Sequence, residues 1–225
     1  MLGRLEFVSG GQGRGEVSDL YGLPVLRVQT DPEGLLGKRR LERAGRTLCR
    51  NGAVRVLLPR GFDRWALLKR FSLRAVDPAP FLRAQAVKLA LGALERRDVD
   101  PIRATVALSG TRTDSEMTRA AVELCGRVRR IVIAAPGGER LANRLREEFG
   151  VPVLPPGGEV QLELRFHPGT RAGASPGLEL YGHDPALDGL HLVYERLGEE
   201  DREDICLLCA LWERGKLEPG CLKFI

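Results

Sequence analysis

The sequence predicts an α/β protein with three layers and a mainly parallel sheet. Between about residues 104 and 155, three short apolar runs alternate with two amphipathic stretches. Near-continuous apolar strands are typical of parallel sheets, which are buried on both faces and joined by helical crossovers. This stretch therefore predicts a strand–helix–strand–helix–strand unit. Shorter strands after residue 156 predict antiparallel additions near the C-terminus.

The first hundred residues also read as alternating strands and helices. The helix begins near Leu36 because Leu41, Ala44 and Leu48 recur at helical spacing, and Asn51-Gly52 supplies a left-handed stop. In this part of the chain we expect strands at 5–8, 24–28 and 54–58 and helices at 36–50, 64–71 and 81–97.

The middle of the chain has the clearest pattern. Thr113 and Glu116 form a capping-box spacing that opens a helix. Proline followed by two glycines at 136–138 leads into the next helix, which ends at Gly150. The strands of this unit are expected at 105–108, 130–134 and 151–154.

The sequence pattern changes in the last third of the chain. Residues 160–166 alternate between apolar and polar, which predicts a half-buried strand with one wet face. A loop rich in Gly, Pro and Ser follows at 167–177, and strands at 178–181 and 190–194 are expected to pair antiparallel at the sheet edge. A final helix is expected at about 199–214, with acidic residues in its first turn.

The strongest break in the chain is Asp98-Val99-Asp100-Pro101. It predicts an N-terminal α/β lobe over residues 1–100 and a Rossmann-like α/β domain over 101–225 that includes the C-terminal strands and helix. Whether the first lobe shares the sheet of the second is left open by the sequence.

Composition limits the class of protein. The chain has 225 residues, 43% of them hydrophobic, and its apolar runs stay below the roughly 18 residues that span a bilayer. The N-terminus carries an early acid and no apolar stretch of the secretory type, and five scattered cysteines do not suggest a disulfide framework. We expect a protein of the reducing cytoplasm without a membrane partner.

The net charge of +5 is unevenly distributed. Residues 1–75 carry +8, residues 76–150 carry +3 and residues 151–225 carry −6. Such a gradient steers an anionic ligand to the first half, or lets copies of the chain or a protein partner meet head to tail. Solvated, arginine-rich helix faces explain the same charges more simply.

The best candidate for a ligand site follows the strand at 105–108. A loop at the carboxyl end of a parallel strand and ahead of a helix is where open α/β sheets bind ligands. Hydroxyl groups, a guanidinium and helix N–H groups there suit a phosphate or carboxylate. The candidate ligand-binding residues are Ser109, Gly110, Thr111 and Arg112, with Gly137 and Gly138 from the next unit.

Four other patterns have simpler structural explanations. The glycine run 11–15 resembles a phosphate loop but lies too close to the next strand for an intervening helix, so we interpret it as a hairpin tip. His183-Asp184 offers a base, but the sequence names no nucleophile for it. We therefore assign no catalytic residue.

The other two patterns are a set of soft metal ligands and a basic cluster. Zinc uses His and Cys, yet Cys206 and Cys209 lie in an apolar helical run typical of a core, so no metal is assigned. The basic cluster has no aromatic platform beside it, so we expect a solvated helix face and no nucleic-acid partner. The ligand set is His167, His183, His191, Cys206, Cys209 and Cys221, and the basic cluster is Lys38, Arg39, Arg40, Arg43, Arg46 and Arg50.

The segment from Thr105 to Leu154 resembles a Rossmann-like βαβαβ half. The glycine spacing of dinucleotide-binding proteins is absent, and Ala134-Ala135 stands where a ribose-binding site wants an acid. The cofactor therefore stays unknown. The chain as a whole resembles bacterial proteins of unassigned function, which implies no activity.

Three functions remain. The first is a small-molecule or nucleotide-phosphate binding protein with a regulatory role. The second is an interaction or scaffold protein without a small-molecule ligand. The third is an enzyme whose reaction the sequence does not assign.

Overall fold

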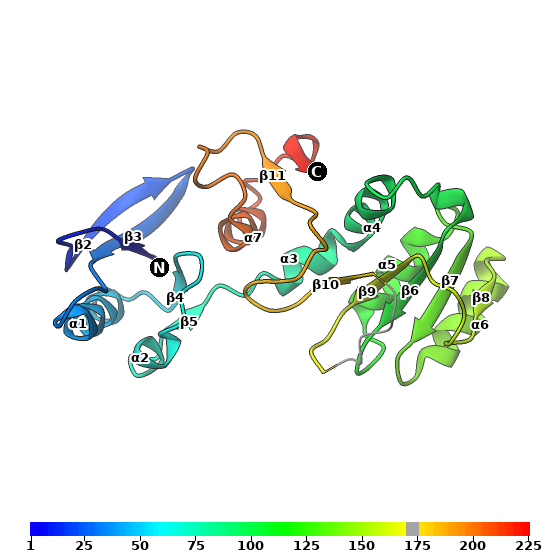
Figure 1. Cartoon of the computed structure of the whole chain (residues 1–225), viewed down its shortest axis with the longest axis horizontal. Coiled ribbons are helices and arrows are strands. Elements are labelled where there is room, and N and C mark those ends of the chain that lie inside the picture. The colour runs from blue at the N-terminus through cyan, green and yellow to red at the C-terminus, as the bar shows by residue number, and fades with distance from the viewer. Residues whose placement is uncertain (170–175) are drawn as a thin grey trace. The chain divides into compact units, whose positions relative to one another are not determined.

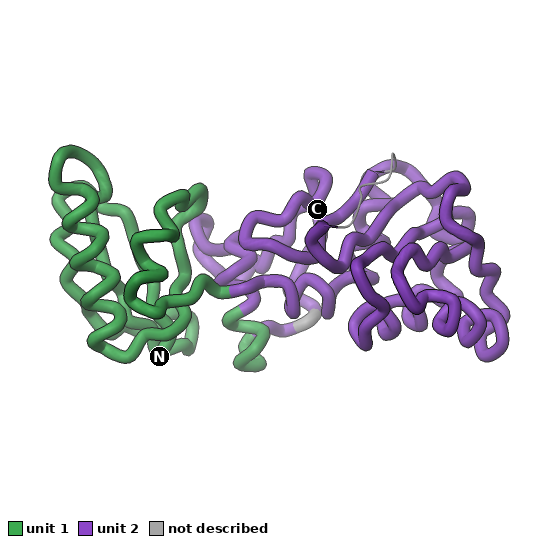
Figure 2. The backbone as a smooth tube through the Cα atoms, turned by 90° about the horizontal axis from the view of Figure 1, so that it is seen from below, with its two compact units in different colours: residues 1–76, 210–216 green, residues 77–209, 217–225 purple. Residues whose placement is uncertain are grey.

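The computed structural model describes residues 1–169 and 176–225, which form two compact units (Figure 2). Unit 1 comprises residues 1–76 and 210–216, and unit 2 comprises residues 77–209 and 217–225. Each unit has its own five-stranded sheet. Part of the predicted loop at 167–177, namely 170–175, lies outside the described residues.

Unit 1 contains sheet A, with the strand order β2-β3-β1-β4-β5 (Figure 1). All neighbouring pairs are parallel except β2 with β3, which form an antiparallel hairpin. The strands are β1 (Leu2–Phe7), β2 (Gln12–Leu20), β3 (Leu23–Thr30), β4 (Arg55–Leu57) and β5 (Arg74–Ala75).

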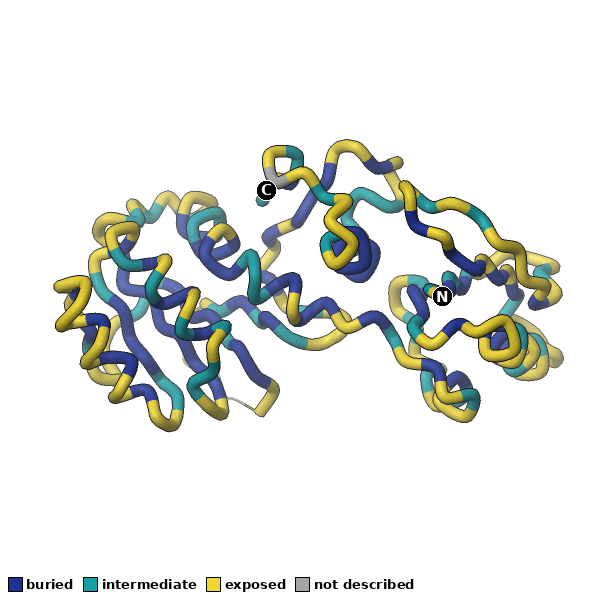
Figure 3. Tube along the Cα trace, turned by 180° about the vertical axis from the view of Figure 1, so that it is seen from behind, coloured by how far each residue is buried: buried dark blue, intermediate teal, exposed yellow. Residues whose placement is uncertain are grey.

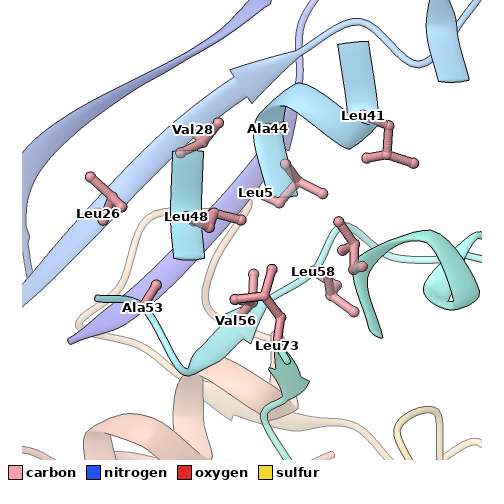
Figure 4. Close-up of a cluster of buried hydrophobic side chains, with 11 residues drawn as sticks. Leu5, Leu26, Val28, Leu41, Ala44, Leu48, Ala53, Val56, Leu58 and Leu73 are labelled. Carbon is pink, nitrogen blue, oxygen red and sulfur yellow. The ribbon is translucent and has the colours of Figure 1, made fainter. Parts of the chain in front are cut away.

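Helix α1 (Gly37–Arg50) supplies one wall of the core of unit 1, and α2 (Trp65–Lys69) packs beside it. The apolar stripe predicted from the sequence is buried, and it meets the inward side chains of the strands (Figure 4). The cluster consists of Leu5, Leu26, Val28, Leu41, Ala44, Leu48, Ala53, Val56, Leu58, Leu68 and Leu73.

The glycine run 11–15 is not the hairpin tip that the sequence suggested. Strand β2 already begins at Gln12, and the run packs closely on its neighbours. A Cβ on Gly13 would lie 3.1 Å from the backbone N of Ala44, and one on Gly15 would lie 3.0 Å from Thr47 Cγ2. The glycines are needed because β2 passes close to α1.

Unit 2 contains sheet B, with the strand order β10-β9-β6-β7-β8, in which every neighbouring pair is parallel (Figure 1). Its central strand is buried along its whole length, and the sheet as a whole is mostly buried (Figure 3). The strands are β6 (Thr105–Ser109), β7 (Arg130–Ala134), β8 (Val153–Leu154), β9 (Leu162–Arg165) and β10 (Gly177–Glu179).

Helices α5 (Ser115–Leu124) and α6 (Gly138–Phe149) connect β6, β7 and β8, as predicted. The apolar helix expected at 81–97 is instead two helices, α3 (Ala79–Ala84) and α4 (Ala86–Glu95). They separate at Gln85, whose backbone leaves the helical region at φ −99° and ψ 7°. Helix α4 packs on both α5 and β9.

The strand at 160–166 differs from its prediction in two respects. Strand β9 pairs parallel with β6, and β10 pairs parallel with β9, so neither is an antiparallel addition. The polar side chains are not on a wet face either, because Glu163 is 6% exposed and its carboxylate pairs with Arg165 at 3.1 Å. The apolar and polar residues of β9 alternate because one face of the strand buries apolar side chains and the other buries the Glu163–Arg165 ion pair.

The antiparallel strands near the C-terminus are β11 (Leu192–Tyr194) and β12 (Leu222–Phe224), which form a separate two-stranded sheet. Helix α7 (Ile205–Glu213) starts later than expected, and its first turn holds no acid. Asp204 instead accepts hydrogen bonds from the N–H groups of Cys206 and Leu207, at 3.0 Å each, as an N-cap does. The α/β class with a mainly parallel sheet is confirmed.

Within the described part of the chain, no helix combines the length and hydropathy that crossing a bilayer requires.

Truncating a core side chain of unit 1 should lower the free energy of unfolding, and tryptophan fluorescence can measure the change. Leu48 is fully buried, so Leu48→Ala should lower the free energy of unfolding by about 2–5 kcal/mol. Both tryptophans of the chain, Trp65 and Trp212, belong to unit 1, so their fluorescence in a urea titration reports on this unit. Leu35, which is fully exposed, is the matched control, and Leu35→Ala should change the value by less than about 0.5 kcal/mol. Equal effects of the two variants would contradict this core.

Candidate functional site

The carboxyl edge of sheet B has the geometry that binds ligands in open α/β sheets. From β6 the chain moves through β7 to β8 on one side, and it then returns to place β9 on the other side of β6. The strand order therefore reverses between β6 and β9. In open α/β sheets, ligands bind outside the carboxyl ends of the strands at such a reversal.

The loop after β6 is joined to the loop after β7. The N–H of Gly110 donates to the carbonyl of Ala134 at 3.3 Å. The N–H and the hydroxyl of Thr113 both donate to the carbonyl of Pro136, at 3.2 and 3.0 Å. These bonds make residues 110–113 and 135–137 one continuous surface at the edge of the sheet.

The predicted site residues divide into a buried and an exposed group. Ser109, Gly110 and Gly138 are buried, whereas Thr111, Arg112 and Gly137 are exposed. The exposed three can reach a ligand, and the buried three shape the backbone beneath them. Within residues 1–169 and 176–225, the Arg112 guanidinium has no ion-pair or hydrogen-bond partner.

Two of the glycines have clear backbone roles. Gly137 precedes α6 with φ +76°, a left-handed conformation that side chains disfavour. A Cβ on Gly138 would lie 2.5 Å from Ile133 Cγ2, so the helix starts in contact with the preceding strand. Helix α6 begins without a side-chain cap. The Gly138 N–H donates to the Ala135 carbonyl at 2.9 Å, and the next N–H groups of the first turn are left for a ligand or for water.

Two residues that the sequence did not assign to this site meet here. Asp114, at the N-cap of α5, and His167, two residues beyond the end of β9, are linked by a hydrogen bond of 2.9 Å between Oδ2 and Nε2. His167 is 4% exposed. Because an ionised carboxylate only accepts hydrogen bonds, Nε2 carries the proton. The capping residue is thus Asp114, which accepts from the Met117 N–H at 2.9 Å, and the predicted capping by Thr113 is wrong.

The environment of Asp114 favours its ionised form. Burial raises the pKa of this carboxyl group, but three favourable contacts outweigh it. These are the hydrogen bond from the Met117 N–H, the hydrogen bond and charge of His167, and the charge of Arg83. The pKa of Asp114 is therefore lower than usual.

Gly110 leaves room for the imidazole ring. A Cβ at this position would lie 2.5 Å from His167 Nδ1 and 2.9 Å from Met117 Cε. The ring therefore lies directly against the backbone at the end of β6. Asp114 and His167 hold β9 and α5 together beneath the exposed loop, and we interpret them as positioning residues.

Arg83, on α3, connects the same elements a second time. Its guanidinium donates to the carbonyls of Phe166 and Leu180, at 2.6 and 3.3 Å, and pairs with Glu116 at 2.8 Å. The carbonyls follow β9 and β10, and Glu116 lies in the first turn of α5. Glu116 thus pairs with a distant arginine, not with its own helix terminus. No local pattern points to Arg83, because its partners lie 33 or more positions away.

The histidines and cysteines of the last third do not converge. Their contacts lie apart: His167 meets Asp114, His191 meets Glu203 at 3.4 Å, and Cys209 Sγ meets the Asp77 carbonyl at 3.4 Å. No group of three such residues in the described ranges is arranged to hold a metal ion.

One pair from this set does meet, Cys206 Sγ and His183 Nδ1, at 3.2 Å. Burial raises the pKa of the Cys206 thiol, and the negative charge of Asp204 raises it further. A protonated thiol is a poor nucleophile. The pair therefore does not supply the nucleophile that His183 lacked in the sequence.

The glycine run of unit 1 borders an open, polar hollow of about 650 Å³, lined by residues 10–12, 14–16, 27 and 29. Asp31 accepts the N–H of Gly10 at 3.1 Å and pairs with Arg40 at 3.0 Å. The hydrogen bonds from Gly10 and Glu33 lower the pKa of Asp31. The Asp31 carboxylate thus fixes the start of the glycine run, and the charged residues that line the hollow are Arg14, Glu16 and Arg27.

Asp114 is expected to stabilise unit 2 in a pH-dependent way. Its pKa is lower in the folded state than its unfolded value of about 3.9, so its contribution is present above that value and is lost as the pH falls through the folded pKa. Asp114→Asn keeps a capping oxygen and removes the charge. It should lower the thermal midpoint at pH 7 and flatten the loss of stability between about pH 5 and pH 2.

The measurement is the thermal midpoint by circular dichroism at a series of pH values between about pH 7 and pH 2. Glu147, which is exposed, gives the control variant Glu147→Gln with the same change of charge. A pH profile of Asp114→Asn that matches this control would show that the carboxylate is not stabilising.

Comparisons with known proteins do not identify the chain. No protein-family model and no curated protein matches it. L-tryptophan dehydrogenase from Nostoc punctiforme matches 73% of this chain and 55% of its own, with 14% identity and a TM-score of 0.33. Ornithine carbamoyltransferase from Pyrococcus furiosus matches 73% and 58%, with 11% identity and a TM-score of 0.28.

A third structure, 5-ketofructose reductase of Gluconobacter sp. strain CHM43, matches 79% of this chain and 73% of its own, with 14% identity and a TM-score of 0.29. The chain spans little more than half the length of the first two. Similarities at these TM-scores carry no argument about function.

Proposed function

We propose that the chain binds a small molecule carrying a phosphate or carboxylate at the carboxyl edge of sheet B. The supporting observation is the joined surface of residues 110–113 and 135–137 at the reversal of strand order. On this surface Arg112 is exposed and has no partner among the described residues. An unpaired guanidinium beside helix N–H groups favours an anion.

Arg112 would pair with the anion through its forked N–H groups, and Thr111 would add a hydroxyl donor. The N–H groups after Gly138 in the first turn of α6 would also donate, since Gly137 leaves this helix without a side-chain cap. Glu139, in that first turn, is exposed and opposes an anion. Glu139→Gln should therefore tighten binding of a phosphate-bearing ligand.

We infer a nucleotide or sugar phosphate in a regulatory role, not a substrate. Dinucleotide binding is disfavoured because Ala134 and Ala135 follow β7 in place of an acid. Neither Ser109 nor Cys206 is an activated nucleophile, since Ser109 Oγ is buried without a hydrogen-bond partner in the described parts of the chain and burial raises the pKa of the Cys206 thiol. Binding alone needs neither.

Thermal stabilisation tests the proposal. A true ligand at about 100 times its dissociation constant stabilises the folded state by about 2.7 kcal/mol, which raises the midpoint by roughly 5–11 °C for a chain of this size. Nucleoside monophosphates, sugar phosphates and inorganic phosphate form the panel. Arg112→Ala should weaken binding by about 10- to 100-fold, as expected for the loss of a charge-assisted bond.

Arg119, exposed on the neighbouring α5, provides the control Arg119→Ala with the same loss of charge. This variant should keep the affinity of the natural chain. If no compound of the panel shifts the midpoint, or if both variants bind equally well, the proposed site is wrong.

A further inference from the structure

Helix α1 exposes a row of cations that the core of unit 1 does not use. Its buried face consists of Gly37, Leu41, Ala44, Gly45 and Leu48. The other side carries five exposed basic residues, which we call the α1 stripe: Lys38, Arg39, Arg43, Arg46 and Arg50.

The side chains of the α1 stripe have no carboxylate partner. Across residues 1–169 and 176–225, none of the five makes an ion pair, whereas the sixth cation of the helix, Arg40, pairs with Asp31. The one acid of the helix, Glu42, faces Arg70 at 3.5 Å. The stripe is thus an uncompensated positive surface.

This arrangement is unfavourable for the isolated helix. Arg39 and Arg43, Arg43 and Arg46, and Arg46 and Arg50 are three or four positions apart, so like charges face each other along one side. Lys38 and Arg39 also lie in the first turn, where the helix dipole disfavours cations, and no acid is present there. A bound polyanion removes both penalties.

The charge density of the α1 stripe is of the same order as that of a nucleic-acid strand. The five charges from Lys38 to Arg50 extend over about 18 Å of helix axis, with a mean spacing of roughly 4.5 Å. One strand of a duplex carries one phosphate per roughly 3.4 Å. This complementarity goes beyond the solvated face that the composition suggested.

The stripe contains no aromatic side chain on which a base could stack. Phe71 lies against Gly45 on the buried side of the helix, where a Cβ would approach its ring within 2.7 Å. Contacts would therefore be to phosphates alone. We propose that the α1 stripe binds the phosphate backbone of double-stranded nucleic acid without sequence preference.

The test is the fluorescence anisotropy of a labelled duplex of about 20 base pairs with the full chain, at salt concentrations from 50 to 200 mM. Five phosphate contacts predict a slope of about −4.5 in log affinity against log salt, a loss of roughly 500-fold over this range. The variant Arg39→Gln, Arg43→Gln, Arg46→Gln, Arg50→Gln should lose only about 3- to 4-fold over the same range and bind far more weakly at 50 mM.

A matched control removes four exposed arginines of unit 2 by Arg119→Gln, Arg127→Gln, Arg129→Gln and Arg140→Gln. It should keep the slope of the natural chain. The proposal is overturned if the natural chain does not bind the duplex at 50 mM, or if the control loses as much affinity as the stripe variant. It is also overturned if single-stranded nucleic acid or heparin binds at least tenfold more tightly than the duplex.

Discussion

The parallel pairing of β9 with β6 is the interaction on which the candidate site depends. The Phe166 N–H donates to the Ser109 carbonyl at 2.9 Å, and Arg165 lies opposite Ser109 in the register. This pairing brings His167 to Gly110 and to Asp114, although the chain between them includes two helices and three strands. A β9 placed beyond β8 would lie about 14 Å from β6, and the reversal of strand order would not exist.

Several elements serve that one junction. Asp114 caps α5 and holds His167, while Arg83 ties α3 to the backbone after β9 and β10 and to Glu116. These bonds are made beneath the exposed loop, which leaves Arg112 free to contact solvent or ligand. Hydrogen bonds and an ion pair beneath an exposed cation position its backbone and leave its side chain unpaired.

The sequence predicted what local patterns control. Apolar strands with helices between them identified β6, α5, β7, α6 and β8, and Leu41, Ala44 and Leu48 identified the buried side of α1. Prediction from the sequence failed where a residue's interaction partner lies far away along the chain. The alternation of residues 160–166 looked like a solvent-facing strand because Glu163 and Arg165 neutralise each other inside the fold. Likewise, Thr113 and Asp114 are both suitable N-cap residues by type. Asp114 takes this position, and its carboxylate also accepts a hydrogen bond from the distant His167.

The most direct test of the carboxyl-edge site is a two-dimensional amide NMR titration of the full chain with a nucleoside monophosphate. The proposed site predicts that the largest shift changes occur at Arg112, Thr113, Gly137, Gly138 and Glu139, and that they saturate together with one dissociation constant. Changes confined to the glycine run of unit 1 or to the α1 stripe, or no saturable change at millimolar ligand, would contradict a site at the carboxyl edge of sheet B.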